Sequence, residues 1–360
     1  MEGVPVVQES KRSKILKLIS KILDSQFGIS LLSIIISLFM LAIMAMIYKA
    51  NPIQVIVTLL QGALKGKRAI TFTLMQMAPL IMTALAVYIP SRARFFNVGA
   101  QGQLEIAGLV AMIVSTTVKG SPIFVITLAM LAAMVAGMIT VIVPLVLKIK
   151  GGASEITTTI MMNFICTNFV YALITGPLKD PDAFYAASHG VPEQYKLLSI
   201  PAGSDINIGI YLSVFIALIV GWYMKNTVVG MKLKATGMNM NAARVAGINV
   251  NRMMIGATFA GAACAGFAGG MVLLGVTYRI AEGWALAWGT TGVAVAHLGG
   301  SPLGIIPVAF VLAIIETGAR YMQAITGVPS AMVMVMQGAP VVVFICLVGI
   351  KQLYKMKKVG

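Results

Sequence analysis

The hydrophobic pattern of this chain consists of long apolar runs separated by short polar and basic segments. A helix that crosses a bilayer needs about 20 predominantly apolar residues, with a range of about 17–25. The pattern therefore predicts an all-α, polytopic membrane protein with about ten transmembrane helices. We place them at residues 27–48, 69–90, 97–118, 122–147, 154–175, 205–224, 253–276, 284–299, 304–323 and 329–350. The third and eighth are short or are interrupted by glycine and polar residues.

The polar segments divide the chain into three parts. Residues 1–26 are predicted to be a basic cytoplasmic segment, residues 27–350 a single transmembrane domain, and residues 351–360 a cytoplasmic tail. Within the domain, 176–203 is expected to be an external loop shaped by prolines, and 225–252 a cytoplasmic loop. The apolar stretch 53–64 is expected to lie on the membrane surface or to re-enter the membrane.

Composition supports the same class of protein. The chain is 59% hydrophobic and only 11% charged, whereas soluble domains carry roughly 25% charged residues. With both termini in the cytoplasm, two thirds of the 27 Lys and Arg residues fall in cytoplasmic segments, as the positive-inside rule requires. The basic cluster at 65–68 does not follow this rule. No loop interleaves basic and aromatic residues, which excludes nucleic acid as a partner.

Catalytic and metal-binding patterns are missing from the sequence. Cys166, Cys264 and Cys346 lie in apolar runs and are interpreted as buried small side chains. There is no CxxC, HExxH or paired-carboxylate motif, and no phosphate-binding loop. We therefore expect no metal, no cofactor and no enzymatic activity. An integral-membrane enzyme would need a clustered acid, base or metal set.

Two polar segments begin predicted helices. The stretch FFNVGAQGQLEIAG brings Asn97 and Gln101 into the start of the third helix, and GGASEITTTIMMN brings Glu155 and Asn163 into the fifth. Asn163 lies about 12 Å deeper than Glu155 along an ideal helix. These side chains either line a polar solute pathway or satisfy each other across helices, with Asn97 as a helix cap.

Other side chains at predicted helix ends have two interpretations each. Trp284 and Trp288 either anchor the eighth helix at the membrane interface or stack against a solute ring. Glu316 and Arg320, four residues apart, are expected to form an ion pair, with a role in substrate binding as the alternative.

The segment 226–249 is a long basic segment in the second half of the chain. An Asn cap followed by a short helix ending at glycine would form a protruding knob for a soluble partner; the alternative is a solvated surface turn. The residues proposed for this docking are Lys232, Lys234, Asn239, Asn241, Ala242, Ala243, Arg244 and Gly247.

Four blocks in this order resemble one known family. They are FFNVGAQGQ, GGASEITTTIMMN, KATGMNMNAARVAGI at 234–248, and the Gly-rich segment 289–304. Together they are similar to the permeases of bacterial ABC importers for branched-chain amino acids, sugars and nucleosides. The FNVG form and the long external loop look most like the nucleoside branch, which depends on a basic membrane lipoprotein. The resemblance covers roughly residues 70–350.

The resemblance implies a type II-like importer permease in the bacterial cell (inner) membrane, surrounded by lipid. It implies an extracytoplasmic solute-binding protein or lipoprotein outside, ATP-binding cassette ATPase subunits docked on 239–247 inside, and a second permease subunit, expected to form a heterodimer. Four positions depart from the family pattern. Gln101 replaces a usual Glu, Ser154 replaces a usual Asn, and Lys234 and Thr236 replace Arg and a small apolar residue.

The expected function is import of nucleosides by alternating access, powered by the separate ATPase. A monosaccharide permease of the same family and an ATP-independent carrier are the alternatives. The expected solute pathway contains Asn97, Gln101, Glu155, Asn163, Trp284 and Trp288.

Overall fold

The computed structural model describes residues 26–47, 50–200, 206–285 and 287–327, together with a few residues between 335 and 348. Within these ranges the regular elements are all helices. They are α2 Gln26–Ile47, α3 Pro52–Leu64, α4 Lys67–Ser91, α5 Ala100–Thr117, α6 Pro122–Thr140, α7 Ile142–Gly151, α8 Glu155–Thr175, η1 Glu193–Tyr195, α9 Ile208–Asn226, α10 Val228–Met238, α11 Met240–Val245, α12 Val250–Val272, η2 Leu273–Thr277, α13 Trp288–Gly299 and α14 Pro302–Thr326.

Seven helices are long and apolar enough to cross a membrane, judged within the described ranges. They are Gly28–Ile47, Lys67–Ser91, Pro122–Gly151, Glu155–Thr175, Ile208–Asn226, Val250–Thr277 and Pro302–Thr326. The predicted third and eighth spans correspond to α5, which has 18 residues, and α13, which has 12. The predicted span 329–350 lies mostly outside the described residues. The prediction of a polytopic helical membrane protein is confirmed, whereas the number ten and the orientation of the termini stay predictions.

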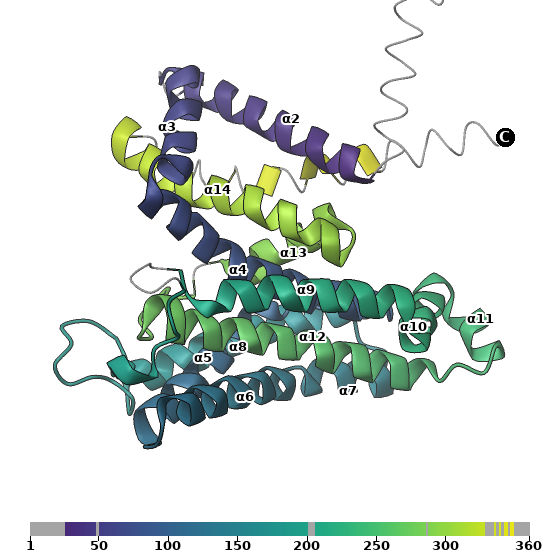
Figure 1. Ribbon diagram of the computed structural model, residues 1–360. Coiled ribbons are helices and arrows are strands. Elements are labelled where there is room, and N and C mark those ends of the chain that lie inside the picture. Colours follow the sequence, from purple (N-terminus) through teal and green to yellow (C-terminus); the bar gives the residue numbers. More distant parts are fainter. Residues whose placement is uncertain are drawn as a thin grey trace, which may run out of the picture.

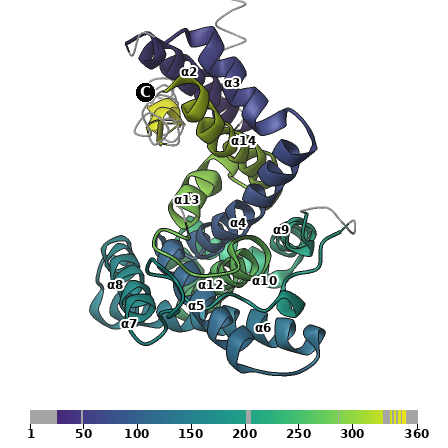
Figure 2. The same cartoon turned by 90° about the vertical axis from the view of Figure 1, so that its left-hand side faces the viewer.

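The helices form two packed groups joined through α4 and α13 (Figure 1). In one group α12 lies in the middle and packs against α4, α5 and α6, and in the other α14 packs against α3 and α4 (Figure 2). Helices α10 and α11 lie at one end of the molecule, and the loop that follows α8 lies at the opposite end (Figure 1). This arrangement places residues 176–200 of the predicted external loop and the predicted cytoplasmic loop 225–252 at opposite ends of the molecule.

Glycines allow α12 to approach its neighbours closely. A Cβ atom added at Gly269 would lie 2.2 Å from the carbonyl oxygen of Leu104 in α5, and one at Gly266 would lie 2.4 Å from that of Ala133 in α6. Helices in membranes associate through such small-residue contacts, because lipid offers little hydrophobic drive for helix pairing. By contrast, a Cβ atom at Gly256 in the same helix would meet no atom within 4 Å.

We therefore expect Gly269→Ala to lower the free energy of unfolding by about 1–3 kcal/mol, the usual cost of overpacking. The matched variant Gly256→Ala should be neutral or stabilising by up to about 1 kcal/mol, since alanine favours helix. Thermal unfolding of the two purified variants in detergent measures the difference. Equal melting temperatures would contradict the packing argument.

The structure adds detail to some predicted segments. The apolar run 122–147 is interrupted at Val141, so that α6 ends at Thr140 and α7 continues to Gly151. The stretch 53–64 forms α3, a 13-residue helix packed against α14, with Gly62 beneath Tyr321. Cys166 and Cys264 are buried as predicted, but Cys346 is exposed, so the prediction of burial is wrong there.

The loop 176–200 is fastened to the segment that follows α12. The backbone N–H groups of Ser188, Val191 and Leu197 donate to the carbonyl oxygens of Ile280, Tyr278 and Leu274 at 2.7–2.8 Å. These three bonds hold the loop across the end of α12. They also fix the start of residues 281–285, which form one wall of the cavity described next.

Candidate functional site: a polar cavity and a protruding helix

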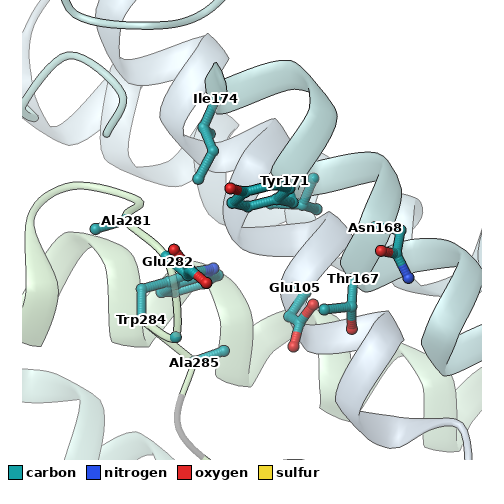
Figure 3. A pocket seen from close by; sticks show the side chains of 11 residues that line it. Glu105, Thr167, Asn168, Tyr171, Ile174, Ala281, Glu282, Trp284 and Ala285 are labelled. Atoms are coloured by element: carbon teal, nitrogen blue, oxygen red, sulfur yellow. The ribbon is translucent and has the colours of Figure 1, made fainter. Parts of the chain in front are cut away.

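A cavity of about 350 Å³ lies between α5, α8 and the segment 281–285. Figure 3 shows the α8 side chains on one side of it, the segment 281–285 on the other, and Glu105 of α5 between them. Its volume falls within the range of about 300–1,000 Å³ that is usual for small-molecule sites. The lining residues are Glu105, Thr167, Asn168, Val170, Tyr171, Ile174, Ala281, Glu282, Gly283, Trp284 and Ala285.

Irregular backbone shapes the wall formed by 281–285. Helix α12 passes into a π-helical turn, Leu273–Thr277, and Tyr278 then adopts the left-handed conformation with φ of 59°. Gly283 has φ of 70°, a conformation that glycine adopts without a steric penalty. Non-helical backbone at membrane depth occurs where it is buried in protein or lines a wet cavity. These turns direct the Trp284 side chain toward α5.

Gly108 makes room for Trp284. A Cβ atom at Gly108 would lie 2.1 Å from a ring carbon of the indole. The indole is therefore pressed against the α5 backbone and is only 9% exposed. Its Nε1 atom is buried and has no hydrogen-bond acceptor among the described residues. In this conformation the donor is therefore both unsatisfied and covered by protein atoms.

The polar floor of the cavity is built around Glu105. Its Oε1 atom accepts a 2.8 Å hydrogen bond from Gln101 Nε2, and its carboxylate also hydrogen-bonds with the Thr167 side chain. Glu105 is 7% exposed, and no basic side chain lines this cavity. A buried carboxylate offers acceptors to hydroxyl or amino groups of a polar solute. With Tyr171 and Trp284 in the walls, the cavity combines aromatic faces with hydrogen-bonding groups.

Of the six residues predicted to line the solute pathway, only Trp284 lines this cavity. Gln101 does not line the cavity but contacts a residue that does, because its Nε2 atom donates to Glu105. Its Oε1 atom accepts a 2.7 Å hydrogen bond from the Gly289 N–H. Gln101 thus ties the start of α13 to α5. A charged Glu at this position would face the Glu105 carboxylate without the Nε2 donor.

Asn97 and Asn163 hold the turn before α5. Asn97 is fully buried; its Nδ2 atom donates to Ala86 O at 3.2 Å, and its Oδ1 atom accepts from Gly99 N at 3.0 Å. The predicted cap at Asn97 is wrong in detail, since Gly99 is the N-cap residue of α5. Asn163 bonds across helices to Val98 O at 2.9 Å and Gly102 N at 2.8 Å.

Glu155 and Trp288 are also engaged away from the cavity. Glu155 forms a 2.6 Å ion pair with Lys148 across the turn between α7 and α8. Trp288 is 1% exposed, and its Nε1 atom donates to Gln76 Oε1 at 2.7 Å. Burial excludes the role of interface anchor for Trp288, because an anchor must reach the headgroup region. The expected ion pair of Glu316 with Arg320 is present at 3.5 Å.

Sequence reasoning missed Thr167, Asn168 and Tyr171 as lining residues. Their signal was nevertheless present, because Asn163, Thr167 and Tyr171 recur every four residues and therefore share one face of α8. Glu105 was noted only as part of a polar helix start. No group of three or more His, Cys, Asp or Glu side chains that could hold a metal occurs within the described ranges.

The second candidate site is the short helix α11, at the end of the molecule opposite the loop 176–200 (Figure 1). Asn239 is its N-cap, and Asn239 Oδ1 accepts from Asn241 N at 2.9 Å and Ala242 N at 3.1 Å. Gly247, with φ of 77°, follows its last turn. The predicted capped helix is therefore present. Arg244 is exposed and Val245 is 91% exposed, whereas Ala243 is 3% exposed.

The base of this protrusion is fixed to the turn that follows α4. Arg94, which has φ of 59°, donates from Nε to Gly237 O at 2.8 Å and from a terminal nitrogen to Met238 O at 2.9 Å. These carbonyls belong to the last turn of α10, directly before α11. The turn 92–94 continues through residues 95–99 into α5, so the Arg94 side chain connects the base of α11 to the element that carries Glu105.

The fold and these sites define a polytopic helical membrane protein with a polar cavity among its helices and a protruding helix at one end. The family model described as branched-chain amino acid transport system / permease component matches residues 69–345, and the chain belongs to this family. No solved structure matches the chain.

Curated relatives span most of the chain. It is 30% identical to the nucleoside ABC transporter permease protein NupB of Lactococcus lactis, over 86% of this chain and 88% of the relative. It is 31% identical to the guanosine ABC transporter permease protein NupP of Bacillus subtilis, over 72% of this chain and 76% of the relative. It is 26% identical to the glucose ABC transporter permease protein TsgB13 of Haloferax volcanii, over 93% and 90%.

Proposed function

We propose that this chain is the permease subunit of an ABC importer for nucleosides, and that the cavity at Glu105 and Trp284 is the solute site. The observation that carries the proposal is the cavity itself, which joins aromatic side chains to a buried carboxylate in about 350 Å³. The relatives named for nucleoside and guanosine transport support this choice of solute.

The chemistry of a nucleoside matches the cavity. Its planar base can lie against Trp284 or Tyr171, and a stacked base gains about 1–3 kcal/mol from an aromatic side chain. Glu105 and the exposed carboxylate of Glu282 can accept hydrogen bonds from ribose hydroxyls or exocyclic amino groups. A nucleoside carries no charge, so the cavity needs no basic residue.

A second permease subunit is proposed to cover α8. Only 17% of this span is buried, and its exposed residues include the polar side chains of Thr167 and Asn168. Polar side chains in a span rarely face lipid and usually face protein or a wet pathway. A partner permease against α8 would close the cavity from that side and give the solute a path between two subunits. We expect this partner to be a different chain, giving a heterodimer.

The remaining partners are proposed from the two ends of the molecule. An ATP-binding cassette ATPase would dock on α11 and drive alternating access; ATP hydrolysis belongs to that partner. An extracytoplasmic solute-binding protein or lipoprotein would deliver the nucleoside at the end that carries 176–200. The bacterial cell (inner) membrane, with α11 on the cytoplasmic side, fits the distribution of Lys and Arg.

A monosaccharide importer is the second candidate. The relative named for glucose transport covers 93% of the chain, and the carboxylates of the cavity would suit sugar hydroxyls equally well. An ATP-independent carrier is a weaker alternative, which the absence of an associated ATPase would support.

The test is uptake by the assembled importer, expressed with its ATPase, receptor and partner permease. We expect accumulation of radiolabelled guanosine or adenosine to depend on ATP, and to be competed by unlabelled nucleosides but not by ribose or glucose. Uptake of ribose or glucose without nucleoside uptake would replace the proposal with the monosaccharide alternative. Uptake that persists without the ATPase would indicate a carrier.

A further inference from the structure

A second cavity, of about 280 Å³, lies near the end of the molecule that carries α11. Its walls come from the last turns of α9, the first half of α10 and the first turns of α12, with Ile89 of α4 at the back, and they include Ile219, Tyr223, Val229, Leu233, Gly256 and Ala260. Nearly all of these side chains are apolar. We call this cavity the α9–α12 groove. It shares no lining residue with the cavity at Glu105 and Trp284, which we call the proposed solute cavity.

The groove lies at the boundary between bilayer and water. Helices α9 and α12 are both long and apolar enough to span a membrane, and the groove is lined by their ends nearest α10. Ile219 is 45% exposed and Tyr223 40%, so the groove opens on the surface. Beside it, Trp222 and Met231 are 62% and 69% exposed. Exposed tryptophan and tyrosine at one level of a membrane protein mark the headgroup region.

A basic side chain, Arg252, lies at the opening of the groove without an acidic partner among the described residues. Arg252 lines the groove and lies in the first turn of α12, where the helix dipole is already positive. No ion pair with Arg252 occurs among the described residues. Lys225 ends α9, and Lys232 and Lys234 lie on α10. From 206 to 281 the sequence contains no Asp or Glu, so protein groups on these helices cannot balance this charge.

We propose that an anionic phospholipid occupies the α9–α12 groove, with an acyl chain between the three helices and its phosphate at Arg252. The apolar walls fit a hydrocarbon chain, and the Arg252 guanidinium fits a phosphate. The lipid contacts Val229 and Leu233 of α10, the helix that leads directly into α11. This inference depends on the chain lying in a membrane and does not depend on which solute is carried.

Trp222 provides a built-in probe for the test. The chain has three tryptophans, and Trp284 and Trp288 are 9% and 1% exposed. Bromine atoms on lipid chains quench nearby indoles, so quenching in bilayers of increasing bromolipid content reports mainly on Trp222. We expect brominated phosphatidylglycerol to reach half-maximal quenching of the full chain at about fivefold lower mole fraction than brominated phosphatidylcholine, the preference that one headgroup–cation contact provides.

Two variants distinguish binding of lipid in the groove from attraction of lipid to surface charge. Arg252→Gln should remove the preference for phosphatidylglycerol. Gly256→Leu should also remove it, because a side chain at this open position fills the groove while leaving Arg252 in place. Ala260→Leu serves if Gly256→Leu does not fold. The control Lys150→Gln changes an exposed basic residue on α7 and should keep the preference.

Three results would overturn the proposal. The first is equal quenching of the unaltered chain by the two lipids. The second is a preference that survives Arg252→Gln. The third is a preference that Arg252→Gln removes but that both groove-filling variants retain, since this would indicate attraction of lipid to surface charge without occupation of the groove.

Discussion

Trp284→Ala is expected to weaken nucleoside binding by the assembled importer roughly 5- to 150-fold, the range that follows from losing one stacked base worth about 1–3 kcal/mol. Trp284 lies in the wall of the solute cavity opposite α8, and its indole is held against Gly108. The loss should appear as a raised KM for nucleoside uptake. Trp284→Phe should retain most of the uptake, because an aromatic face remains.

The control for this prediction is Phe184→Ala. Phe184 is fully exposed in the loop between α8 and α9, away from the cavity. It tests whether loss of any aromatic side chain on that side of the molecule reduces uptake. Melting temperatures of all three variants separate loss of the solute site from loss of fold, since Trp→Ala substitutions in cores cost about 3–5 kcal/mol. Unchanged KM in a folded Trp284→Ala protein would place the solute elsewhere.

The second large effect is expected at α11. Arg244→Glu combined with Val245→Asp should weaken association with the ATPase by about 30-fold or more, which corresponds to the 2 kcal/mol that defines an interface hot spot. Both side chains are exposed at the tip of the protrusion, and Val245 is an apolar group with 91% exposure. Copurification of the ATPase and uptake driven by ATP should both be lost, while the permease keeps its melting temperature.

The structure also shows which substitution cannot serve this test. Ala243 is 3% exposed, so Ala243→Asp would bury a charge and disturb α11 itself. The matched control is Lys150→Glu, which reverses an exposed charge at the end of α7 without touching α11. If the ATPase still copurifies with the Arg244→Glu, Val245→Asp protein, α11 is not the docking element.

A short series of contacts joins the base of α11 to α5 and α8, which line the cavity at Glu105. Arg94 binds the last turn of α10, and the chain from Arg94 continues through Asn97 into α5, which carries Glu105. Asn163 holds the same turn against α8. We propose that a partner docked on α11 would displace it, and that these contacts would transmit the displacement to α5 and α8, two walls of the proposed solute cavity, as alternating access requires.

The amino-acid sequence by itself determined the class of this protein and the positions of most of its helices. Runs of about 20 apolar residues have one stable solution in lipid, because every backbone polar group must be satisfied within a helix. The capped helix at 239–247 was equally predictable, since an Asn cap and a terminal glycine act locally.

Only the tertiary structure decided which polar side chains surround a cavity. Asn97, Glu155 and Trp288 look like pathway residues in the sequence, yet they are engaged in contacts away from the cavity, to Ala86, Lys148 and Gln76. Thr167, Asn168 and Tyr171 were overlooked because the sequence does not show which elements lie opposite α8, and its polar face becomes recognisable only when α5 and 281–285 lie opposite it. Whether a polar group in a membrane is structural or faces a solute depends on partners distant in sequence.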